Sequence, residues 1–118
     1  MTLPRFEYFA PERLDDALLM LSQKGKGAFV MAGGTDLVMK MNRGLVKPAA
    51  IISLTRIKGL SRIDFDRRKG LTIGATALIA EVASHPEIKK RYYQILFRCK
   101  RSNLSRYNSI KALSRKFF

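Results

Sequence analysis

The sequence predicts an α+β fold in which short helices lie beside a small mixed sheet. Three observations predict it: apolar residues recur at helical spacing over residues 14–21, compact apolar runs of strand length occupy 28–31 and 49–54, and a charged loop at 66–70 separates two further strand-like segments. A chain of 118 residues has the length of one ordinary domain, so we expect a single core.

The first expected elements are a strand and a helix. Residues 5–9 alternate charged or polar residues with aromatic ones, as short strands do. Pro11 suits the first turn of the following helix, and the acidic residues at 15–16 suit the positive end of the helix dipole. Gly25 and Gly27 are expected to end this helix.

A second strand, a glycine turn and a second helix come next. The strand is expected at 28–31 and the turn at Gly33 and Gly34. The apolar residues that follow predict a short helix from about Leu37, which closes at Gly44.

The second half of the chain is expected to begin with three strands. The run at 49–54 is rich enough in β-branched residues to form a buried strand. Residues 60–65 and 71–75 flank the charged loop and predict a β-hairpin. Thr76 is expected to cap a short helix over 77–83.

A further helix is expected to begin near Ser84. Ser84 and Glu87 have the spacing of a capping box, in which the two side chains satisfy each other's free backbone donors. His85 is interpreted as part of this turn. Helical spacing persists to Cys99 and weakens beyond Lys100.

Several kinds of site and location are not supported. The longest apolar runs are far too short to span a bilayer, and the amino terminus lacks the pattern of a secretory signal, so a cytoplasmic location is expected. Cys99 has no cysteine or histidine at ligand spacing, so we predict no disulfide and no metal site. With one histidine, His85, we predict no catalytic residue. Residues 25–30 lack the third glycine of the dinucleotide-binding fingerprint.

Positive charge is concentrated at the carboxyl end of the chain. The net charge is +14, yet residues 1–87 hold all nine acidic residues, whereas residues 88–118 hold ten Lys and Arg and no acid. This basic segment, interleaved with Tyr107, Phe117 and Phe118, could contact phosphates and stack on bases. No nucleic-acid motif accompanies it, so a solvated or accidental basic tail is the preferred interpretation and nucleic acid is not an expected partner.

The Gly33 and Gly34 turn is the strongest candidate for chemistry. Two glycines between a strand and a helix let main-chain N–H groups face outward with no Cβ in the way, and the helix adds its positive dipole end. Thr35 could donate a hydrogen bond, whereas Asp36 would repel phosphate and is assigned to capping or to orienting the loop. On spacing alone, such a turn is more often an ordinary turn than a ligand site.

The run over residues 29–37, followed by Met39 and Lys40, resembles the first flavin motif of the FAD-binding domain of molybdopterin dehydrogenases. This PCMH-type family includes the medium subunit of carbon monoxide dehydrogenase and the flavin portions of xanthine and aldehyde oxidoreductases. The similarity covers residues 3 to about 96. Other segments agree in order and spacing: the strand at 6–8, the helix at 11–21, Pro48, the strand at 51–54, and residues 71–76 with Glu81 and Val82.

The resemblance implies an oxidoreductase component that binds FAD and carries electrons between iron-sulfur clusters and an acceptor. It implies two partners, a molybdopterin-binding large subunit and a [2Fe-2S] small subunit, and it leaves the substrate open. Gly33, Gly34 and Thr35 are expected to meet the pyrophosphate, and Gly74 to serve close packing. The residues expected to line the FAD are Val30, Met31, Ala32, Gly33, Gly34, Thr35, Asp36 and Leu37.

The sequence departs from the family near residue 97. The second flavin segment and the carboxy-terminal subdomain of the family are not visible, and a basic, acid-free stretch takes their place. We therefore expect residues 1–97 to be the amino-terminal part of the FAD-binding domain. The basic tail at 98–118 is expected to be disordered or to arise from a truncation or shifted reading frame. The alternatives are a non-catalytic fragment and a nucleic-acid-binding protein.

Overall fold

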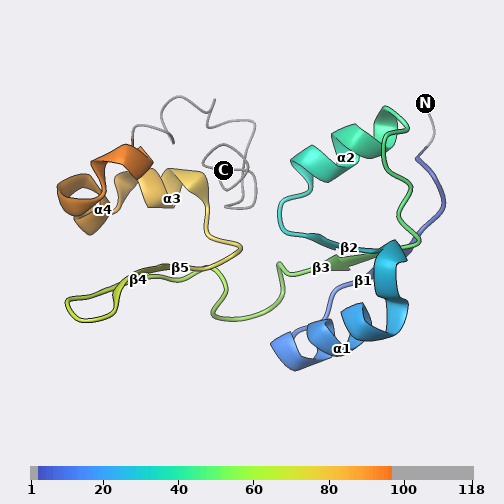
Figure 1. Cartoon of the computed structure of the whole chain (residues 1–118), viewed down its shortest axis with the longest axis horizontal. Coiled ribbons are helices and arrows are strands. Elements are labelled where there is room, and N and C mark those ends of the chain that lie inside the picture. Colours follow the sequence, from blue (N-terminus) through green and yellow to red (C-terminus); the bar gives the residue numbers. More distant parts are fainter. Residues whose placement is uncertain (1–2, 97–118) are drawn as a thin grey trace. The chain divides into compact units, whose positions relative to one another are not determined.

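The computed structural model describes residues 3–96. These residues form two compact units, and the boundary between the units in the sequence lies between Lys58 and Gly59. The first unit contains a three-stranded sheet and the second a two-stranded sheet (Figure 1). The prediction of an α+β fold is confirmed, but the described strands form one parallel and one antiparallel sheet in place of a single mixed sheet. A single core was expected, whereas the contacts of the chain divide into two compact units.

The first unit is an open, all-parallel α/β arrangement. Its strand order is β1-β3-β2, so β3 lies in the centre and is the last strand of this unit in the sequence. Its elements are β1 (Glu7–Phe9), α1 (Leu14–Lys24), the 3-10 turn η1 (Gly25–Gly27), β2 (Ala28–Met31), α2 (Thr35–Asn42) and β3 (Ala50–Ser53).

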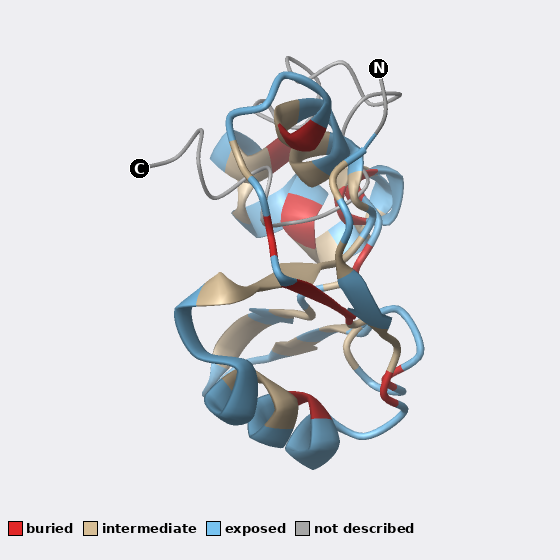
Figure 2. Ribbon diagram, turned by 90° about the vertical axis from the view of Figure 1, so that its right-hand side faces the viewer, coloured by how far each residue is buried: buried red, intermediate tan, exposed pale blue. Residues whose placement is uncertain are grey.

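Helices α1 and α2 lie on opposite sides of this sheet (Figure 1). The connection from β1 to β2 passes over β3, and the connection from β2 to β3 returns in the opposite direction. Because parallel crossovers share one hand, a reversal of direction places the two helices on opposite faces. The central strand β3 is accordingly buried along its whole length, whereas most of α1 is exposed (Figure 2).

Only the carboxyl end of α1 lies where the sequence predicted it. Gly25 ends the helix with a φ of 63°, a left-handed value that glycine adopts at low cost. The helix begins later than expected, at Leu14, because Arg13 is the N-cap and still has extended backbone angles. Pro11 is buried and precedes the helix.

The second unit is a hairpin followed by helices. Its elements are β4 (Ile63–Asp66), β5 (Gly70–Ile73), α3 (Ile79–Ser84) and α4 (Pro86–Arg91), and residues 93–96 are again helical. Asp66 pairs with Gly70 in the antiparallel register, so the loop is shorter than the sequence suggested. The buried cluster of this unit consists of Ala77, Ile79, Val82, Ile88 and Leu96.

Thr76 does not cap α3, which corrects the sequence prediction. The backbone N–H of Thr76 donates to the carbonyl of Leu60 at 2.9 Å, and the N–H of Ala77 donates to Gly74 at 3.1 Å. These bonds hold residues 74–77 in a turn, so the helix begins later and Leu78 is its N-cap.

The capping box at Ser84 was also a wrong prediction, although a helix does begin there. The Ser84 hydroxyl donates backward to the carbonyl of Glu81 at 3.2 Å and so belongs to the end of α3. His85 is the N-cap of α4 and Pro86 is its first residue. Glu87 instead accepts a hydrogen bond from Arg91 at 2.9 Å. Cys99 and the basic tail lie outside the described residues.

Candidate functional site

The glycine turn lies at the carboxyl edge of the parallel sheet in the first unit. In open α/β sheets this edge is where ligands usually bind. The eight predicted site residues form one continuous strand, turn and helix: Val30 and Met31 end β2, Ala32 and Gly33 form a bend, Gly34 is the N-cap of α2, and Thr35, Asp36 and Leu37 form its first turn.

Gly34 is favoured at its position by its backbone angle, and the flexible Met31 side chain occupies the space that a Cβ atom would take. Its φ is 89°, in the left-handed region, where a side chain causes strain. In addition, a Cβ atom built on Gly34 would lie 2.8 Å from Sδ of Met31. The Met31 side chain thus lies against the turn, and the turn keeps its shape because no side chain projects from Gly34.

The amino end of α2 presents backbone donors at the same edge. The N–H of Val38 donates to the carbonyl of Gly34 at 2.9 Å and forms the first hydrogen bond of the helix. The N–H groups of residues 35–37 precede it, and the N-cap side chain, a glycine, supplies no cap. Backbone N–H groups at a helix amino end favour an anion such as phosphate. The turn therefore suits an anionic group such as a phosphate.

Asp36 is paired with Lys40 in the next turn of α2. Nζ of Lys40 donates to Oδ2 of Asp36 at 3.0 Å, and both side chains are partly exposed. This i,i+4 spacing is visible in the sequence, but the pairing was not predicted. The ammonium group offsets the negative charge that would oppose an anion at the turn.

A second segment reaches the same edge and was missed in the sequence. Ser53 ends β3, is the register partner of Met31, and is followed by Leu54, whose N–H donates to the carbonyl of Met31 at 2.9 Å. Oγ of Ser53 lies 2.9 Å from Oγ1 of Thr55. The only feature of the sequence that could have indicated this segment was a serine at the end of an otherwise apolar strand.

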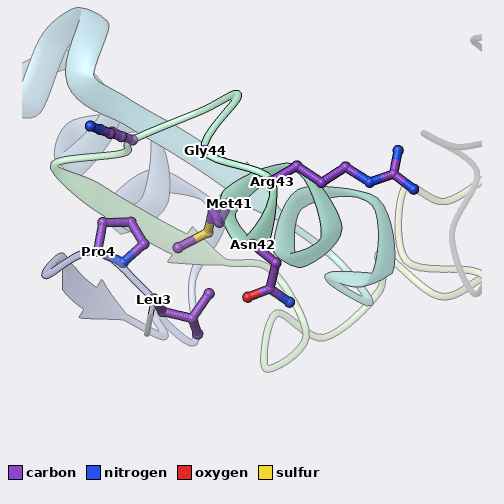
Figure 3. A pocket seen from close by; sticks show the side chains of 7 residues that line it. Leu3, Pro4, Met41, Asn42, Arg43 and Gly44 are labelled. Atoms are coloured by element: carbon purple, nitrogen blue, oxygen red, sulfur yellow. The ribbon is translucent and has the colours of Figure 1, made fainter. Parts of the chain in front are cut away.

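A shallow hollow lies at the opposite end of α2 (Figure 3). It is lined by Leu3, Pro4, Met41, Asn42, Arg43, Gly44 and Lys47. The carboxyl end of a helix presents carbonyl oxygens and a negative dipole end, which suit the two cationic side chains. The hollow lies at the opposite end of α2 from the glycine turn, so it is distinct from the candidate site.

Residues 3–96 contain neither a metal-binding cluster nor a membrane-spanning helix. No group of three or more His, Cys, Asp or Glu side chains there could hold a metal ion. Within the same range, no helix is long and apolar enough to cross a membrane.

Comparison with known proteins gives a family match over most of the chain. The model of the FAD binding domain in molybdopterin dehydrogenase matches residues 4–113. The nicotinate dehydrogenase FAD-subunit of Eubacterium barkeri is 35% identical over 85 residues, which are 71% of this chain and 28% of that protein. The carbon monoxide dehydrogenase medium chain of Hydrogenophaga pseudoflava is 36% identical over 93 residues, which are 77% of this chain and 31% of that protein. The chain thus spans less than a third of either relative.

Solved structures agree with the sequence matches. Carbon monoxide dehydrogenase from Hydrogenophaga pseudoflava is similar with a TM-score of 0.80 and 29% identity, over 92% of this chain and 39% of that one. Quinoline 2-oxidoreductase from Pseudomonas putida 86 has a TM-score of 0.74 and 25% identity, over 84% of this chain and 34% of that one. The family match extends past residue 96, where the expected resemblance ended; those residues lie outside the described range, so the boundary of the basic tail stays a prediction.

Proposed function

This chain belongs to the family of FAD-binding domains in molybdopterin dehydrogenases, and we propose that it forms part of the flavin site of such an oxidoreductase. The observation that carries the proposal is the strand, glycine turn and helix at 28–42. It lies at the edge where ligands usually bind in open α/β sheets, and Gly34 keeps the turn free of a side chain.

The residues of this segment have separate roles in the proposal. The N–H groups at the amino end of α2, together with Gly33, Gly34 and Thr35, bind the pyrophosphate of FAD, and the remaining residues from Val30 to Leu37 line the cofactor. Lys40 offsets the charge of Asp36 at 3.0 Å. Bound flavin would supply the redox chemistry, and these residues bind and orient it.

The partners of the chain follow from the same membership. The relatives are called a FAD-subunit and a medium chain, names that describe components of larger complexes. We propose a molybdopterin-binding large subunit and a [2Fe-2S] small subunit as partners, with electrons passing through the flavin to an acceptor. The proposed location is the cytoplasm. A chain with one cysteine forms no internal disulfide, so its folding does not depend on an oxidising compartment.

The boundary at residue 97 is part of the proposal. Residues 1–97 are assigned to the amino-terminal part of the FAD-binding domain and residues 98–118 to a basic tail. The change of composition supports this assignment, since every acidic residue lies before residue 88.

A titration of the purified chain tests the proposal. FAD is added while flavin fluorescence is followed, and riboflavin, which has no phosphate, is titrated in parallel. We expect saturable one-to-one binding of FAD and weaker binding of riboflavin. Failure of FAD to bind saturably would favour a fragment without flavin affinity.

A further inference from the structure

Ser53 is the only buried polar residue within residues 3–96, with 1% of its surface exposed. A buried hydroxyl is costly unless it is hydrogen-bonded. Oγ of Ser53 lies 2.9 Å from Oγ1 of Thr55, and the backbone N of Thr55 lies 3.5 Å from the same Ser53 oxygen. Two hydroxyls and one N–H group therefore form a local chain at the end of β3.

The hydroxyl–hydroxyl hydrogen bond can run in either of two directions. Each hydroxyl has a single hydrogen to donate. Oγ of Ser53 has two lone pairs, so it can accept from the N–H of Thr55 and also from the Thr55 hydroxyl, and either hydroxyl can be the donor between the two oxygens. When the Ser53 hydroxyl donates, the hydroxyl hydrogen of Thr55 is not used within the pair and can be donated to another group. Thr55 is exposed, so its donor is accessible from solvent.

The position of Thr55 brings this donor to the edge that carries the glycine turn. Met31 and Ser53 are register partners, so their side chains project from the same face of the sheet. The Met31 side chain lies against Gly34, and the carbonyl of Met31 accepts from the N–H of Leu54 at 2.9 Å. The segments that follow β2 and β3 therefore leave the sheet side by side.

We propose that Thr55, oriented by Ser53, donates a hydrogen bond to a phosphate oxygen of the flavin nucleotide at this edge. The inference rests on the proposed function, because it takes the phosphate to lie on the neighbouring Gly34 turn. The added contact comes from the segment that follows β3, whereas the glycine turn follows β2. The phosphate is held from two sides, by backbone N–H groups on one and by a hydroxyl on the other.

The test is an FAD titration of the full chain and of two variants at one position. Thr55→Val keeps the shape of the side chain and removes the hydroxyl, so the Kd for FAD is expected to rise about tenfold or more. Thr55→Ser keeps the hydroxyl and should bind almost as the unsubstituted chain does. Competition by ADP, which carries the two phosphates without a flavin, should weaken in parallel in Thr55→Val.

The matched control is Thr72→Val, which makes the same change at an exposed threonine of β5. It should leave the Kd unchanged, and circular dichroism confirms that each variant is folded. If FAD binds the unsubstituted chain and Thr55→Val binds equally well, the inference is overturned and the proposed function stands. If the unsubstituted chain does not bind FAD saturably, the proposed function is overturned and the inference falls with it.

Discussion

A Cβ atom on Gly74 would lie 2.0 Å from the carbonyl oxygen of Leu60. Gly74 does not have a positive φ, so the requirement for glycine at this position comes from close packing of backbone against backbone. The N–H of Gly74 also donates to the carbonyl of Arg62 at 2.8 Å, which holds the two segments together. The packing role expected for Gly74 is therefore supported by the contact itself.

Gly74→Ala should destabilise the second unit, because backbone cannot move aside as a flexible side chain can. We expect a loss of about 1–3 kcal/mol in the free energy of unfolding, the usual cost of overpacking. Urea denaturation followed by circular dichroism measures it. Ala75→Ser, at the exposed next residue, is the control, and an equally small effect of both substitutions would contradict the packing argument.

Gly34→Ala should destabilise the first unit more than Gly44→Ala does. Both glycines have positive φ, 89° and 68°, so both substitutions incur backbone strain of about 1–2 kcal/mol. Only at Gly34 would the new Cβ atom meet another group, Sδ of Met31, whereas the space at Gly44 is open. The difference between the two losses, measured by urea denaturation, reports the cost of moving the Met31 side chain; equal losses would show that Met31 moves aside without cost.

Asp66 should make the stability of the hairpin depend on pH. Its Oδ1 accepts hydrogen bonds from the N–H groups of Lys69 and Arg68, and these bonds lower its pKa below the ordinary 3.8. A lowered folded pKa means that the stabilisation is present above the unfolded pKa and is lost as pH falls through the folded pKa.

Asp66→Ala should therefore lower the melting temperature at neutral pH and differ less from the unsubstituted chain in strong acid. Asp66→Asn keeps an acceptor oxygen that does not titrate, so it should retain part of the stability with a flatter pH profile. Parallel profiles for all three proteins would show that Asp66 contributes nothing through its charge.

Lys40→Met should weaken FAD binding without unfolding the chain. The substitution removes the ammonium group 3.0 Å from the Asp36 carboxylate and so makes the surroundings of the proposed phosphate more negative. The Kd is expected to rise about two- to fivefold at low salt, the effect of one charge near a helix terminus. Higher salt should reduce the difference, because both side chains are partly exposed.

The double variant Asp36→Asn with Lys40→Met serves as the control for this prediction. It removes both charges and should recover most of the affinity. A double variant that binds no better than Lys40→Met alone would mean that Lys40 acts through something other than the charge of Asp36.

The strand, glycine turn and helix of the candidate site could be predicted because their signals are local. The apolar run at 28–31 has the length of a strand, and Gly33 and Gly34 follow it closely and mark its end. The capping box failed for the opposite reason. Its Ser-x-x-Glu spacing is correct, but the Ser84 hydroxyl bonds to the preceding helix, and the spacing carries no information on that choice.

The role of Ser53 and Thr55 could not be predicted from local signals. It depends on the parallel pairing of β2 with β3, which brings Met31 beside Ser53 from another part of the chain. Short runs such as 49–54 predict a strand but not its neighbours. The division into two units depends in the same way on contacts between distant segments.

The most direct test of the central claim is amide NMR spectroscopy of the isotope-labelled chain during an FAD titration. The largest shifts are expected at the N–H groups of residues 33–37, with smaller ones at Thr55 and little change in α3 and α4. Saturable shifts at these amides would support a phosphate site at the amino end of α2. Saturable shifts confined to other residues, or no shifts on addition of excess FAD, would contradict it.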